Sequence, residues 1–142
     1  MKAKLSFRSL FAILLIFSIA SCKVSLISKY DANVLQEVKT AESLTNKLYE
    51  EAIASEDKTY TFNSGNYELV SVQIASLKDK EAARPKSKLL VAMVSNIEVA
   101  FNKAKGNHRA RGSLNNAELE QFKGVLQRQW KSLLNAERNL PK

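Results

Sequence analysis

The 142-residue chain contains only one cysteine, one histidine, two prolines and four glycines. The single cysteine and single histidine exclude zinc knuckles, paired-cysteine redox sites and disulfide scaffolds. Because glycine and proline are scarce, few residues suit hairpin turns, and the composition disfavours an all-β sandwich or barrel. The sequence also lacks the Glu-x-x-His pairs of a di-metal bundle and the C-x-x-C-H motif of attached haem. We therefore expect no metal and no other cofactor.

Residues 1–21 differ from the rest of the chain. Three basic residues within the first eight positions precede an apolar run over residues 10–20. This order is typical of a secretory signal peptide. The apolar run is shorter than the roughly 20 residues that a membrane-spanning helix needs.

The only cysteine, Cys22, follows the small residues Ala20 and Ser21. Residues 19–22 resemble the bacterial lipobox, which implies cleavage between Ser21 and Cys22. The resemblance also implies transfer of diacylglycerol to the Cys22 thiol, often with a further fatty acyl group such as palmitate on the new amino terminus. The alternative is an ordinary secreted protein with one thiol near its start, although a free thiol is a liability in an oxidising compartment.

Three segments are therefore expected: a signal peptide over 1–21, a lipid-anchored tether over 22–30 and a helical domain over 31–142. The full chain carries 22 basic and 14 acidic residues, a net charge of +8. Loss of the three basic residues of the signal peptide leaves 19 basic and 14 acidic residues, or +5. The charge alone is therefore a weak argument for nucleic acid, which we do not expect as a partner.

Four stretches of the domain have the apolar spacing of amphipathic helices. They run over about 31–55, 67–82, 85–106 and from residue 115 to a point before Pro141, and residues 58–66 are expected to form a loop. Asp31 is expected to cap the first helix and Asn115 the fourth, where Glu118 completes a capping box. Gly106 is expected to end the third helix, and Gly124 suggests either a close helix approach or a tolerated loss of helix propensity. The predicted core positions are Val34, Val38, Ala41, Thr45, Leu48, Ala52, Tyr67, Val70, Ile74, Leu77, Leu90, Met93, Ile97, Ala100, Ala104, Leu119, Phe122, Leu126, Trp130 and Leu133.

Four such helices with short connections predict an all-α fold, an antiparallel four-helix bundle with up-down-up-down topology. Two long helical hairpins that complete their core only in a homodimer are the alternative.

Several short motifs resemble an uncharacterised family of small bacterial lipoproteins. Beyond the lipobox, they are found at residues 30–31, 67, 82–87, 96–98, 108, 112–114 and 129–137. The resemblance implies a helical domain that faces the periplasm. It brings no established activity, so it assigns no functional residue.

Antiparallel topology gathers charge at the bundle end nearest the anchor. Nine basic residues and four acidic residues are expected there, a sum of +5, against zero at the far end. We expect this end to contact anionic headgroups. The alternative is that the charge only aids solubility. The expected contacts are Lys23, Lys29, Arg84, Lys86, Lys88, Arg138 and Lys142.

The far end offers a second candidate site, a basic connection over residues 103–111 that would bind an anionic polymer or a partner protein. Its candidate residues are Lys103, Lys105, His108, Arg109 and Arg111. His108 is expected to be a solvated loop residue, because nothing marks a serine or a carboxylate as its partner. A small enzyme that depends on His108 is the remaining alternative, and we expect no enzymatic activity and no catalytic residue.

The sequence thus favours a non-enzymatic lipoprotein of the bacterial envelope that binds or scaffolds at the periplasmic membrane surface. Lys23 stands where the inner-membrane retention signal would place aspartate, which favours the outer membrane.

Overall fold

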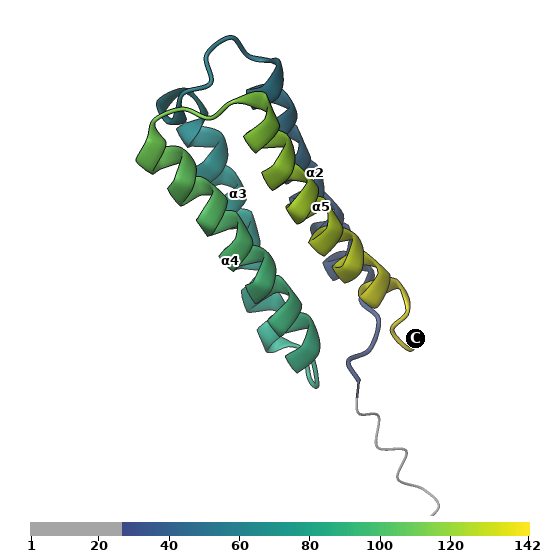
Figure 1. The fold of residues 1–142 in the computed structure, drawn as a ribbon. Coiled ribbons are helices and arrows are strands. Elements are labelled where there is room, and N and C mark those ends of the chain that lie inside the picture. Colours follow the sequence, from purple (N-terminus) through teal and green to yellow (C-terminus); the bar gives the residue numbers. More distant parts are fainter. Residues whose placement is uncertain (1–26) are drawn as a thin grey trace, which may run out of the picture.

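The computed structural model describes residues 27–142, and the predictions for the signal peptide, Ser21, Cys22 and Lys23 lie outside them. Four helices follow one another: α2 (Ala32–Ala54), α3 (Tyr60–Ala83), α4 (Lys88–Arg111) and α5 (Asn116–Arg138). Each helix packs against two neighbours, α2 and α4 against both α3 and α5 (Figure 1). This is the predicted all-α, antiparallel four-helix bundle.

Local capping explains where α2 and α5 begin. The Asp31 side chain accepts hydrogen bonds from the backbone N–H groups of Asn33 and Val34, at 2.8 and 3.3 Å. At the start of α5, the Asn115 side chain accepts from the Glu118 N–H while the Glu118 carboxylate accepts from the Asn115 N–H, both at 3.0 Å. Both predicted caps are confirmed, because each side chain satisfies backbone donors that lack a partner within the helix.

The helix α3 begins at Tyr60, so the expected loop over residues 58–66 is wrong for all but Lys58 and Thr59. Thr59 caps the helix by accepting from the Phe62 N–H at 3.3 Å. Asn63 is buried, and Tyr60 stacks on Tyr67 with ring centroids 5.7 Å apart. These contacts stabilise two further turns despite Gly65, since packing overrides a weak local propensity.

The bounds of α4 also differ from the prediction. Pro85 lies outside the helix, because Lys86 has a positive φ of 63° that interrupts helical geometry before Ser87. Gly106 lies inside α4, and Gly112 ends the helix with φ 75°. A Cβ at Gly106 would meet nothing within 4 Å, so the packing of α4 does not require glycine at this position. Gly112, in contrast, adopts a backbone conformation that favours glycine.

The buried face of α4 is rotated slightly from the predicted one. Met93 and Ala100 are half-buried, while Val94 and Phe101 take the central positions. Phe122 of α5 is likewise half-buried. Every other predicted core position is buried.

Two smaller expectations change with the structure. Gly124 does not mark a close helix approach, since the nearest contact of an added Cβ is Arg128 of the same helix at 3.7 Å. Residues 28–30, which were predicted as the end of the tether, pack on the bundle. Ser28 is buried and the Tyr30 N–H donates to the Pro141 carbonyl at 2.9 Å.

Candidate functional site

The bundle has two ends of different chemistry. The terminal end comprises residues 27–35, 81–90 and 134–142, where the described chain begins and ends (Figure 1). The loop end comprises residues 52–62 and 104–118, around the α2–α3 and α4–α5 connections. The two candidate sites lie at these opposite ends.

An ionic cluster is buried at the terminal end. The carboxyl groups of Glu81 and Glu137 are fully buried on either side of the Arg84 guanidinium. Arg84 Nη1 donates to both oxygens of Glu81 at 2.8 Å and to Glu137 Oε1 at 2.9 Å. Its Nη2 donates to the Lys29 carbonyl at 2.6 Å, which joins the incoming chain to α3 and α5.

Two carboxylates and one guanidinium leave a negative charge in excess within this cluster. Burial is the largest effect on Glu81, followed by its hydrogen bond to Glu137 and the Glu137 charge, and together they raise the pKa of Glu81 from 4.5 to about 8 against the opposing effect of Arg84. Among the described residues nothing donates to Glu137 Oε2. A proton on Glu81 makes the cluster electrically neutral and allows a hydrogen bond between the Glu81 and Glu137 side chains.

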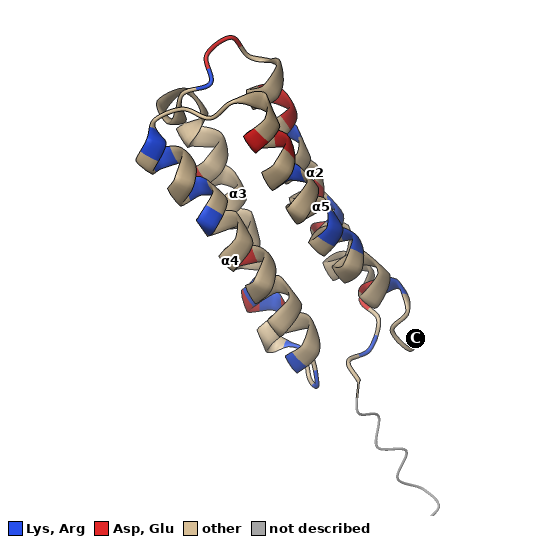
Figure 2. Cartoon of the chain, viewed as in Figure 1, with Lys and Arg blue, Asp and Glu red and all other residues tan. Residues whose placement is uncertain are grey.

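The ionic cluster bears on the predicted contact between Arg84 and anionic headgroups. Arg84 was expected to face anionic headgroups, but its side chain is only 11% exposed and its donors are engaged inside the protein. Lys80 pairs with Glu37, and Lys78 pairs with Glu98 at 2.6 Å, so neither adds an unbalanced charge to this end. The exposed basic residues of the terminal end are Lys29, Lys86, Lys88, Arg138 and Lys142. Figure 2 shows Lys and Arg positions, in blue, at this end of the ribbon.

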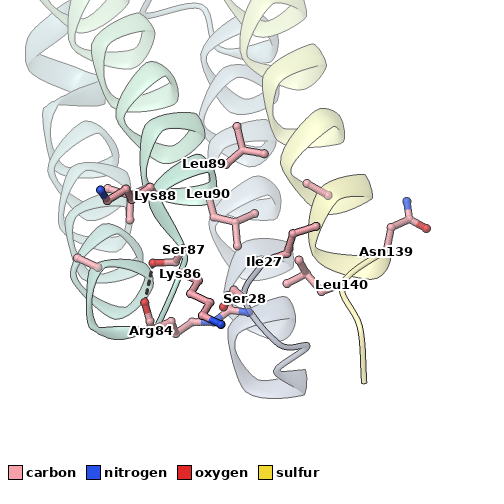
Figure 3. Close-up of a pocket in the computed structure, with 13 residues that line it drawn as sticks. Ile27, Ser28, Arg84, Lys86, Ser87, Lys88, Leu89, Leu90, Asn139 and Leu140 are labelled. Atoms are coloured by element: carbon pink, nitrogen blue, oxygen red, sulfur yellow. Dashed lines mark hydrogen bonds between the residues drawn. The ribbon is translucent and has the colours of Figure 1, made fainter. Parts of the chain in front are cut away.

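A cavity of about 1040 Å³ opens at the same end. Leu89 and Leu90 from the start of α4, Ile27 from the incoming chain and Leu140 beyond α5 surround it (Figure 3). Ile27 is 57% exposed and Leu89 70% exposed. The terminal end therefore combines exposed apolar side chains with exposed lysines and arginine.

The loop end contains a neutral polar cluster centred on His108, which is fully buried. Its Nε2 lies 2.9 Å from the Lys58 carbonyl, and its Nδ1 lies 3.0 Å from the Tyr67 hydroxyl. Since a carbonyl only accepts, we assign the proton to Nε2 and make Nδ1 the acceptor from Tyr67. The imidazole thereby fastens the α2–α3 connection to α4.

Aromatic rings enclose this histidine. The Tyr67 and Tyr60 rings meet it edge to face, with centroids 5.6 and 5.8 Å away. Burial raises the pKa of Tyr67 to about 12, and it raises the pKa of Tyr49 further, helped by the neighbouring Tyr67. Both tyrosines therefore stay protonated at neutral pH.

The prediction of a solvated His108 in a basic loop is wrong. Residues 103–111 are helical, and His108 continues the buried face of Ile97, Phe101 and Ala104. Lys105 pairs with Glu68 at 2.6 Å, and Arg111 pairs with Glu118.

Lys103 and Arg109 remain exposed on α4. The five residues predicted as one basic site therefore do not form a single surface.

Sequence reasoning missed the ionic cluster, although a signal for it was present. Glu81 follows Ile74 and Leu77 at the spacing of the buried face of α3, and Glu137 follows Trp130 and Leu133 in the same way on α5. Two acids on core faces at one end of a bundle predict a buried basic partner, because an unpaired buried carboxylate is costly.

Neither site contains a recognisable metal centre. The described residues include no group of three or more histidine, cysteine, aspartate or glutamate side chains placed to hold a metal ion. None of the described helices is apolar enough over its length to cross a membrane.

Comparisons with models of protein families, curated proteins and solved structures give no match for this chain. The resemblance to small bacterial lipoproteins therefore stays a prediction that rests on its motifs.

Proposed function

We propose that this chain is a non-enzymatic lipoprotein of the bacterial envelope, anchored through Cys22, whose terminal end rests on the periplasmic face of a membrane. The observation that carries the proposal is the surface of that end. Five exposed basic residues lie at the same end as the exposed apolar side chains of Ile27 and Leu89, and Lys86 and Lys88 line the same cavity as these two. Apolar side chains and cations together suit the interface of an anionic bilayer.

The position of this surface supports the same function. Only four residues separate Cys22 from Ile27, a span of at most about 18 Å in extended chain. An anchor on Cys22 would therefore hold the terminal end, and not the loop end, against the lipid. The absence of aspartate at position 23 favours the outer membrane.

The lipid anchor is tested by metabolic labelling. The full chain is expressed in bacteria that receive an alkyne analogue of palmitate, and the label is detected on the protein after electrophoresis. We expect label on the unaltered chain and none on Cys22→Ser. Unlabelled protein, or equal label on Cys22→Ser, would contradict the anchor.

Contact with the membrane surface is tested separately. Residues 22–142 with Cys22→Ser contain all four described helices, so their binding to sedimented vesicles reports the surface alone. We expect retention by phosphatidylglycerol vesicles and not by phosphatidylcholine vesicles, with loss at high salt. Neutralising Lys29, Lys88 and Arg138 to glutamine should abolish retention, whereas the matched changes Lys103→Gln and Arg109→Gln at the loop end should not. Equal retention by both vesicles would contradict the proposal.

A further inference from the structure

The cavity at the terminal end has the properties of a ligand site. Its volume of about 1040 Å³ is at the upper limit for pockets that bind small molecules. Ile27, Leu89, Leu90 and Leu140 give it an apolar lining that comes from three separate segments of the chain (Figure 3). It is open to solvent on one side, so a ligand can enter without rearrangement of the core.

Charge at the rim has one sign. Lys86 and Lys88 line the cavity and are exposed, and the lining includes no acidic residue among the described part of the chain. Arg84 also lines the cavity, but Glu81 and Glu137 balance its charge. The two lysines thus favour a ligand that is anionic at one end.

The cavity opens onto the seam between α4 and α5, since Leu89 and Leu90 of α4 and Ala136 of α5 line it. A separate, smaller cavity of about 290 Å³ lies one turn further along each helix, and its lining combines Met93 and Val125 with the polar residues Asn96, Arg128, Gln129 and Ser132. From Leu140 to Val125, which lines this second cavity, α5 and its extension rise by about 22 Å. The seam therefore suits an extended ligand better than a compact one.

We propose that the terminal end binds one long-chain fatty acid anion, with the acyl chain along the α4–α5 seam and the carboxylate beside Lys86 and Lys88. Apolar length and a single negative charge match the lining and the rim. The site goes beyond membrane anchoring, since it neither uses Cys22 nor requires a bilayer.

The test uses delipidated residues 22–142 with Cys22→Ser and palmitate labelled with ¹³C at the carboxyl carbon. Titration below the aggregation limit of palmitate, followed by NMR, should show one saturable site. Hexadecanol, which has the same chain without the charge, should bind at least tenfold more weakly in calorimetry. Absence of a saturable palmitate site, or equal binding of hexadecanol, would overturn the proposal.

Substitutions assign the site to the cavity. Leu89→Glu places a carboxylate in the lining and should weaken palmitate binding more than tenfold. Val99→Glu is the matched control, because Val99 is 67% exposed on the same helix and does not line the cavity. Equal effects of the two changes, with both variants folded by circular dichroism, would overturn the assignment.

Lys86→Gly with Lys88→Ala tests the rim. Glycine suits the positive φ at position 86, so this pair should keep the fold and weaken palmitate binding several-fold while leaving hexadecanol unchanged. Lys103→Ala with Arg109→Ala is the matched control. No difference between the two pairs would overturn the role of the lysines.

A second copy of the chain is the competing occupant. Sedimentation that shows a dimer broken by Leu89→Glu and unaffected by palmitate would assign the apolar seam to self-association and overturn the proposal. Labelling at Cys22 is independent of all these measurements, so failure of the anchor and failure of the fatty acid site remain distinguishable.

Discussion

At the terminal end the bundle buries two carboxyl groups around one guanidinium, whereas at the loop end it buries an imidazole among tyrosines. Both clusters join the connecting segments to the helices, and both use side chains that lie on otherwise apolar faces. The terminal cluster depends on charge and on the protonation of Glu81, whose pKa is raised to about 8. The loop cluster is neutral, so the two ends should respond differently to substitution and to pH.

Removal of the guanidinium should have the largest effect. Arg84→Met leaves Glu81 and Glu137 buried without a cation, and breaking such a pair costs about 3–5 kcal/mol of the free energy of unfolding. Urea denaturation measures this loss. Arg138→Met, on the exposed surface of the same end, should stay within about 0.5 kcal/mol of the unaltered protein. Equal losses of the free energy of unfolding in both variants would contradict a stabilising role for Arg84 between the two buried carboxyl groups.

Substitutions in the His108 cluster of the loop end should lower the free energy of unfolding by less. His108→Ala removes the partner of the Tyr67 hydroxyl and the Lys58 carbonyl and leaves a cavity, a cost of about 2–4 kcal/mol. Tyr67→Phe removes one hydrogen bond and should cost about 1 kcal/mol. Tyr60→Phe is the control, since the half-buried Tyr60 contributes its ring to the cluster. A Tyr60→Phe loss as large as that of Tyr67→Phe would contradict the assigned hydrogen bond.

The raised pKa of Glu81 predicts that the free energy of unfolding depends on pH through the terminal end. Because the folded protein holds the Glu81 proton more tightly than the unfolded chain does, this group stabilises the fold fully below pH 4.5. Its contribution falls as the pH rises from 4.5 toward about 8, by at most about 1.4 kcal/mol per pH unit.

Glu81→Gln mimics the protonated acid and should flatten this decline in thermal melts across the neutral range. Glu120→Gln, at an exposed position of α5, should leave it unchanged. A decline that persists in Glu81→Gln would locate the titrating group elsewhere.

The smallest effects concern two glycines of the loop end. Gly106→Ala lies within the last two turns of α4 with no atom within 4 Å of the new Cβ, and should stabilise the protein by about 1 kcal/mol. Gly112→Ala should instead destabilise it by about the same amount, because φ is 75° there. Thermal melts of the two variants should therefore shift in opposite directions.

Much of the fold could be predicted from local patterns. The periodicity of α2 and α5 and the caps at Asp31 and Asn115 depend on neighbours within one turn, so the sequence displays them directly. The start of α3 could not be predicted in this way. It depends on Tyr60 packing against Tyr67 and on the bond between the Tyr60 N–H and the Gly112 carbonyl, 52 positions away.

The candidate sites show the same division. The exposed lysines of the terminal end were predicted. In an antiparallel bundle, the position of a charged residue along the chain already determines at which end it lies. Arg84 and His108 were misjudged, because a charged or polar side chain is normally solvated unless distant residues supply its partners.

The sequence by itself thus determined four amphipathic helices, their antiparallel order and the charge at each end, since these properties are local or additive along the chain. Only the tertiary structure decided which polar groups are buried and which remain at the surface. Glu81, Arg84 and Glu137 come from two helices and the turn between α3 and α4, and His108 meets Tyr67 across 41 positions. Burial without penalty requires partners brought together in space, and that arrangement exists only once the helices have packed.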